Sequence, residues 1–140
     1  MDVVSAAASV VALVQISAKV ASLCAEYYSQ VKSAQNDIHR FQREVGALIE
    51  VLQNLQELAH KPGAEKLFTS NALDEPIQSC LSDLRRFKEK LEPGKGRKAM
   101  RRYGIRALKW PFESKELEKA IGVLERYKST FRTALNVDQT

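Results

Sequence analysis

The sequence predicts an all-α protein: a four-helix, up-and-down bundle with a hydrophobic N-terminal helix and a basic segment before the last helix. Apolar residues recur in steps of three and four along four segments, and no segment shows the period-two alternation of a strand. The pairs Pro62-Gly63 and Pro93-Gly94 divide these segments. A chain of 140 residues has the size of one domain. Four helices with short connections favour a single bundle over residues 1–140.

The first predicted helix is apolar on almost every side. Between Val3 and Ala25 the only charged residue is Lys19. At 100° per residue, large side chains form one stripe and small side chains form a second, which leaves a narrow polar strip. A helix of this kind belongs inside a bundle or in a membrane, and we expect it to be buried in the resting bundle with its small face against neighbouring helices. The large stripe is Leu13, Ile16, Val20, Leu23 and Tyr27, and the small stripe is Val4, Ala7, Val11, Val14, Ala18, Ala21 and Ala25.

The length of this apolar segment is marginal for a membrane span. The run from Val3 to Ala18 would reach about 24 Å, which is short of a hydrocarbon core of about 30 Å. Extension to Ala25 gives about 34 Å but includes Lys19, whose charge must snorkel to the interface. A signal peptide is not indicated, because Asp2 is the only charge before the run. We therefore expect conditional insertion, through Val4, Val10, Val11, Leu13, Val14, Ile16, Val20 and Leu23.

Three further helices follow. The second predicted helix of the chain carries the clearest apolar stripe, from Val31 to Ala59. The third predicted helix runs between Leu73 and Leu91, with Asn71 or Asp74 as its N-terminal cap. The last begins after Pro111, with Ser114 as its cap. A two- or three-stranded coiled coil built on the second helix is the structural alternative. The side chains predicted to form the helix–helix core are Phe41, Leu48, Leu52, Leu55, Leu84, Trp110 and Leu124.

Positive charge is concentrated between Gly94 and Phe112, where no acidic residue occurs. The formal net charge is +5, and the seven basic residues of this segment leave −2 for the rest of the chain. Apolar and aromatic residues alternate with them, as suits an anionic membrane surface, where each cation contributes about 1 kcal/mol. Nucleic-acid phosphates and simple solvation are the alternatives. The residues predicted to bind anionic lipid are Lys95, Arg97, Lys98, Arg101, Arg102, Arg106 and Lys109.

The sequence carries no pattern typical of catalysis. His39 and His60, the only histidines, lie far apart and lack metal-ligand spacing. Cys24 and Cys80 fall at apolar positions of helical patterns, which indicates reduced core residues, with a structural disulfide as the alternative. We therefore expect no enzyme activity, no metal site and no cofactor.

Three stretches together resemble the HeLo-like (HELL) domain, which stands at the N-terminus of fungal NOD-like receptors and other STAND proteins. They are the opening MDVVSAAASVVALVQISAKV, the Tyr27-Tyr28 pair with VKSAQNDIHRFQREVGALIEVLQNLQEL, and LKWPFESKELEKAIGVLERYKSTFRTAL. The resemblance covers about residues 1 to 138, and Lys109-Trp110-Pro111-Phe112 is its most distinctive piece.

This resemblance implies a cell-death execution domain, of the heterokaryon-incompatibility or innate-immunity type, that is similar to necroptosis effectors. Such a domain oligomerises, moves from the cytoplasm to the plasma membrane and permeabilises it. The implied partners are anionic lipids, further copies of itself, and an attached or partner STAND or amyloid-signalling protein, so we expect an N-terminal piece of a longer protein. The alternative is a helical interaction or autoinhibitory module without lipid activity, which the stripe of the second helix supports. Nucleic-acid binding ranks third.

Overall fold

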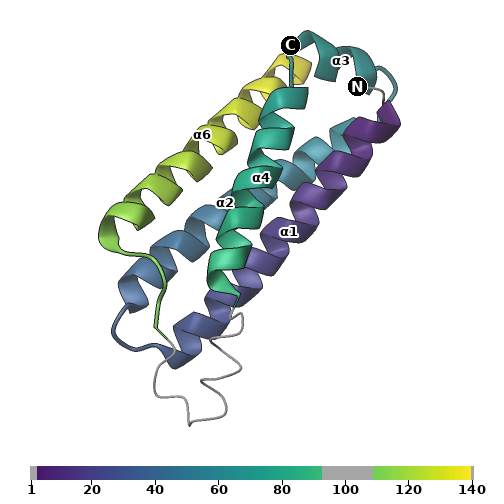
Figure 1. Cartoon of the computed structure of the whole chain (residues 1–140). Helices are drawn as coiled ribbons and strands as arrows, with labels where there is room; N and C mark the ends of the chain where they lie inside the picture. Colours follow the sequence, from purple (N-terminus) through teal and green to yellow (C-terminus); the bar gives the residue numbers. More distant parts are fainter. Residues whose placement is uncertain (1–2, 93–108, 140) are drawn as a thin grey trace.

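The computed structural model of the chain describes residues 3–92 and 109–139, which form five helices and no strand. The all-α prediction is therefore confirmed for these residues. Four of the helices are long and one is short. Figure 1 shows the long helices side by side and the short one across the end of the bundle where the first helix begins and the last one ends. The helices are α1 (Val3–Gln30), α2 (Gln35–Ala59), α3 (Ala64–Ser70), α4 (Asp74–Leu91) and α6 (Ser114–Gln139).

The long helices do not pack equally against one another. Helix α1 packs extensively against α2 and α4, and α2 also packs against α6. In contrast, α4 and α6 make few contacts, although α6 is the next described helix after α4 along the chain. The seam between α4 and α6 is therefore the loosest of these four helix pairs.

Helix α2 follows its sequence pattern closely. Every third or fourth residue from Ile38 to Ala59 is apolar and buried, while charged and amide side chains fill the other faces. After α2 the chain turns at Gly63, whose φ of +85° is a left-handed conformation that glycine adopts without steric cost. Helix α3, which the sequence pattern did not predict, begins at the next residue and buries Ala64 and Phe68.

The two predicted helix caps are wrong. Leu73 precedes α4 and makes no side-chain capping bond, and its own side chain is buried in the core. The Asn71 side-chain amide instead donates to the Leu67 carbonyl, at 2.9 Å, at the end of α3. At α6 the first backbone bond runs from the Leu117 N–H to the Glu113 carbonyl, so Ser114 lies inside the helix. At the start of α4, burial of the Leu73 side chain thus stabilises the fold more than a side-chain capping bond would.

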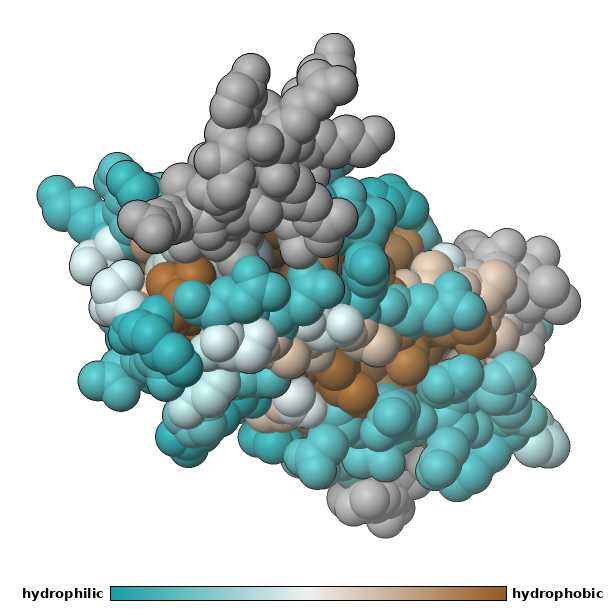
Figure 2. Space-filling model, turned by 90° about the horizontal axis from the view of Figure 1, so that it is seen from below, coloured by the Kyte–Doolittle hydropathy of each residue, from teal (hydrophilic) through white to brown (hydrophobic). Residues whose placement is uncertain are grey.

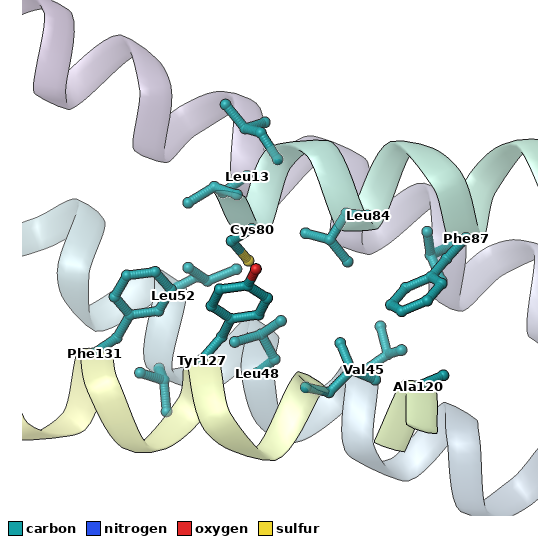
Figure 3. Close-up of a cluster of buried hydrophobic side chains, with 14 of the residues drawn as sticks. Leu13, Val45, Leu48, Leu52, Cys80, Leu84, Phe87, Ala120, Tyr127 and Phe131 are labelled. Carbon is teal, nitrogen blue, oxygen red and sulfur yellow. The ribbon is translucent and has the colours of Figure 1, made fainter. Parts of the chain in front are cut away.

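The core runs along the whole bundle and draws side chains from every long helix (Figure 3). The predicted core residues of α2, α4 and α6 are all buried, and Trp110 is half-buried against the same cluster. The buried face of α6 also includes three residues outside the predicted core set, Ala120, Tyr127 and Ala134. The buried members of the predicted set are Phe41, Leu48, Leu52, Leu55, Leu84 and Leu124.

Candidate functional site: an apolar helix and an aromatic bundle end

Helix α1 is more apolar than its place in the bundle requires. Its stretch Ala6–Gln30 is long and apolar enough to cross a membrane by length and composition, and 33% of an 18-residue window within it is buried. At about 1.5 Å per residue the whole stretch exceeds a hydrocarbon core of about 30 Å. A core helix of a soluble protein and a signal sequence near the N-terminus pass the same test of length and composition. Helix α2 buries a similar share, nine of its 25 residues. The distinguishing property of α1 is therefore the apolar composition of its outward side.

The predicted inserting residues divide between two faces of α1. Val10, Leu13, Val20 and Leu23 point into the core. Val11, Val14 and Ile16 are half-buried at the edge of the interface. Val4 lies in the first turn of the helix, and its side chain is outside the described set.

The small-residue stripe faces the neighbouring helices only in part, which corrects the sequence-based expectation: Ala7, Val14 and Ala21 pack against the core with one edge. Ala18 and Ala25 are exposed, and Ala7, Val11 and Ala21 are half-buried. The side that packs against α2 and α4 instead carries larger side chains, because they remove more apolar area from water. We call the group Ala7, Val11, Val14, Ala18, Ala21 and Ala25 the outer strip of α1. Figure 2 shows apolar surface between rows of hydrophilic side chains on the face seen from below.

One polar group interrupts the buried face of α1. Ser17 is 0% exposed, and its hydroxyl has no hydrogen-bond partner among the described residues. A buried hydroxyl without a partner costs about 1–3 kcal/mol. Ser17 therefore weakens the attachment of α1 to the rest of the bundle.

Five aromatic side chains meet at the end of the bundle opposite α3. Tyr27, Phe41 and Phe87 come from α1, α2 and α4, and Trp110 and Phe112 come from the segment that leads into α6. Ring centroids lie 5.1 Å apart for Phe41 and Phe112 and 5.5 Å apart for Tyr27 and Trp110. The Tyr27 hydroxyl also donates to the Leu91 carbonyl at 2.9 Å. This aromatic cluster packs the segment that leads into α6 against α1, α2 and α4.

The predicted lipid-binding cations adjoin the aromatic cluster in sequence. Lys109 precedes Trp110 and is exposed. The other six, Lys95, Arg97, Lys98, Arg101, Arg102 and Arg106, lie outside the described residues. Lys109 is therefore the one member of this set that the structure locates.

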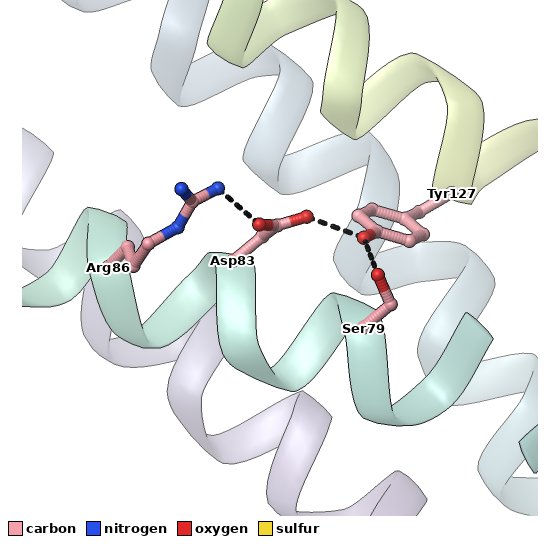
Figure 4. Close-up of polar contacts among 4 residues, drawn as sticks. All are labelled: Ser79, Asp83, Arg86 and Tyr127. Atoms are coloured by element: carbon pink, nitrogen blue, oxygen red, sulfur yellow. Dashed lines mark hydrogen bonds and ion pairs between the residues drawn. The ribbon is translucent and has the colours of Figure 1, made fainter. Parts of the chain in front are cut away.

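A polar network across the α4–α6 seam was not predicted (Figure 4). The Tyr127 hydroxyl donates to the Asp83 carboxylate, and Ser79 then donates to the Tyr127 oxygen at 2.7 Å. Asp83 also pairs with Arg86 on the same helix. Burial and the bond to Asp83 raise the pKa of Tyr127 to about 12. Because 44 residues separate Tyr127 from Asp83, no local pattern indicates this contact.

The arrangement suits packing and surface binding. Cys24 and Cys80 are buried free thiols, and burial raises the pKa of Cys24 to about 12 and that of Cys80 further. A thiol needs its thiolate form to act as a nucleophile, so neither is activated at neutral pH. No group of His, Cys, Asp and Glu side chains within residues 3–92 and 109–139 could hold a metal ion.

Comparison with known families gives a match over nearly the whole chain. Residues 1–138 match the family described as pigment biosynthesis cluster protein PigL N-terminal. The chain belongs to this family. The PigL N-terminal match includes α1 and the aromatic cluster, so both lie within the family domain. Neither the curated proteins nor the solved structures gave a match.

Proposed function

We propose that this PigL N-terminal domain is a membrane-permeabilising cell-death execution domain, a four-helix, up-and-down bundle of the HeLo-like kind that oligomerisation activates. The observation that carries the proposal is the apolar outward side of α1, a helix long enough to span a bilayer. In water this outer strip gains little from the bundle, whereas in hydrocarbon the same side chains are favourable. The domain resides in the cytoplasm and relocates to the plasma membrane on activation.

Membrane contact begins at the basic segment. Lys109 is exposed beside the aromatic cluster, and six further cations precede it in the sequence. Lysines and arginines gain about 1 kcal/mol each at an anionic surface, and half-buried Trp110 belongs to the residue type that favours the headgroup level. Anionic lipid therefore attracts the end of the bundle at which the aromatic cluster lies.

Insertion of α1 follows. The buried face of α1 contains Ser17 without a partner, which lowers the cost of leaving the core. In lipid, the small side chains of the outer strip allow close packing between helices of several copies. Self-association through Ala7, Val11, Ala18 and Ala25 then stabilises the inserted state. An attached or partner STAND or amyloid-signalling protein would supply the clustering that starts this sequence.

Dye release from vesicles tests the proposal. We expect the purified chain, clustered through a fused inducible dimerisation tag, to release dye from phosphatidylserine vesicles and much less from neutral ones. Val11→Glu, on the outer strip, should abolish release while thermal unfolding stays close to wild type. Gln53→Glu on the exposed side of α2, outside the inserting helix, is the matched control and should leave release unchanged. Equal release by Val11→Glu and wild type would remove α1 from the mechanism.

Lipid attraction has a separate test. Neutralising the seven cations from Lys95 to Lys109 to glutamine should reduce co-sedimentation with phosphatidylserine vesicles, and added salt should reduce wild-type binding in the same way. Neutralising exposed Lys61, Lys66 and Arg132 is the control. Unchanged binding after the first substitution would overturn this step.

A second function fits the same outer strip. An exposed apolar helix face can also dock a protein partner, and the domain would then be an interaction or autoinhibitory module without lipid activity. Expression in fungal cells separates the two: an execution domain relocates to the plasma membrane and kills, whereas a module of this kind does neither.

A further inference from the structure

The α4–α6 seam contains a groove that the proposed membrane activity does not use. Its volume is about 400 Å³, and it lies at the end of the seam nearest the aromatic cluster. Phe87, Phe112, Ala120 and Val123 supply its apolar lining. The groove exists because α4 and α6 make few contacts and because Ala120 and Val123 are short. Its volume lies within the range of about 300–1,000 Å³ that is common for small-ligand pockets.

Charged side chains line the same groove, and cations outnumber carboxylates. They are Arg86, Lys90 and Lys119, against Glu116. Lys90 pairs with Glu116 and its Nζ lies 5.3 Å from the centroid of the Phe112 ring. Arg86 pairs with Asp83. Lys119 is exposed and makes no ion pair within the described part of the chain, so its charge is free to meet a ligand.

This combination fits one kind of small molecule. An apolar lining beside a basic rim suits a ligand with an apolar tail and an anionic head, because each part meets a matching surface. Lys119 supplies an uncompensated cation for the head, and the two phenyl rings supply the contact for the tail. We propose that the α4–α6 groove binds a single-chain carboxylate amphiphile, that is, a free fatty acid.

Trp110 provides the readout. It is the only tryptophan of the chain, and its ring centroid lies 5.3 Å from that of Phe112 in the groove wall. Titration of the full chain with decanoate, below micelle formation and without vesicles, should change Trp110 emission saturably. Decanol, the uncharged counterpart, should bind about tenfold more weakly because it lacks the carboxylate. Equal affinity for the two would exclude a role for the basic rim and overturn the proposal.

Two variants with a matched control complete the test. Lys119→Gln should weaken decanoate binding about threefold to tenfold and leave decanol binding unchanged. Arg132→Gln, which removes an exposed cation of α6 outside the groove, should change neither. Val123→Asn should weaken both ligands, with circular dichroism showing that the helices remain. Absence of a saturable response, or equal effects of Lys119→Gln and Arg132→Gln, would overturn the proposal.

A protein partner is the competing occupant. Saturable binding of an acidic amphipathic peptide that depends on Lys119, without any response to decanoate, would replace the fatty acid with a partner helix and also overturn it. Because no vesicle is present in these experiments, their failure leaves the proposed membrane activity untouched. Failure of vesicle release, conversely, would not change the decanoate result.

Discussion

Helices α1 and α2 occupy similar positions but use their apolar residues differently. They contain 28 and 25 residues, and each packs against the other and against one further long helix. Helix α2 separates a buried apolar stripe from polar faces, as an amphipathic helix does. Helix α1 buries a similar share of its residues but is apolar nearly all round, with alanines and valines on its outward side, where α2 carries charged and amide side chains. Bundle packing therefore accounts for the composition of α2 but leaves the outer strip of α1 to be explained by a second role.

The largest expected effect concerns the buried stripe of α2. Leu52 is fully buried, so Leu52→Ala should lower the free energy of unfolding by about 2–5 kcal/mol. Val14→Ala on the outer strip of α1 should cost less than about 1 kcal/mol, because Val14 is only half-buried. Urea unfolding measures both. Equal losses would show that the two helices contribute alike and would end the contrast between them.

The buried hydroxyl of Ser17 is a second point at which α1 differs from α2. Ser17→Ala removes a buried hydroxyl without a partner and adds helix propensity, so it should raise the free energy of unfolding by about 1–2 kcal/mol. Dye release should then become slower, because α1 is held more firmly. Ser22→Ala, at an exposed position of the same helix, gives the effect of helix propensity alone. A Ser17→Ala variant no more stable than Ser22→Ala would show that Ser17 is not a weak point.

The smallest effect concerns the polar network at the loose seam. The pKa of Tyr127 is raised from 10.0 to about 12, so between these pH values the unfolded chain loses the proton that the folded chain keeps. Stability should therefore fall as pH rises from about 10 to about 12, and this part of the fall should be absent in Tyr127→Phe. Absorbance titration of the wild type and of Tyr127→Phe should differ by one tyrosine that ionises late, at about pH 12. A difference of one tyrosine that ionises at about pH 10 would contradict the network.

Regular amphipathic patterns made much of the fold predictable. Leu48, Leu52 and Leu84 stand at helical spacing among polar residues, so one face of each helix is plainly the core face. In α1 the same spacing rule does not identify the buried face, because apolar residues occur on nearly every side of the helix. The large buried side chains of α1 were therefore predictable. The burial of Ser17 was not predicted, and the small-residue stripe, which was expected to face the core, does so only in part.

Contacts between distant residues were beyond prediction. The bond from Tyr127 to Asp83 and the groove beside Lys119 both depend on how α4 and α6 lie relative to one another. Helix α3 has only seven residues, too few for a periodic pattern to stand out. The predicted cap at Asn71 failed because burial of Leu73 set the start of α4.

The most direct test of the account asks whether the outer strip of α1 enters hydrocarbon. An Ala18→Cys variant labelled with an environment-sensitive fluorophore at neutral pH reports on the strip, since Cys24 and Cys80 are buried and their raised pKa keeps them unreactive. Gln53→Cys on the exposed side of α2 is the control. On phosphatidylserine vesicles, spin labels on the acyl chains should quench the label at residue 18 and spare the label at residue 53. Dye release with residue 18 still in water would contradict the account.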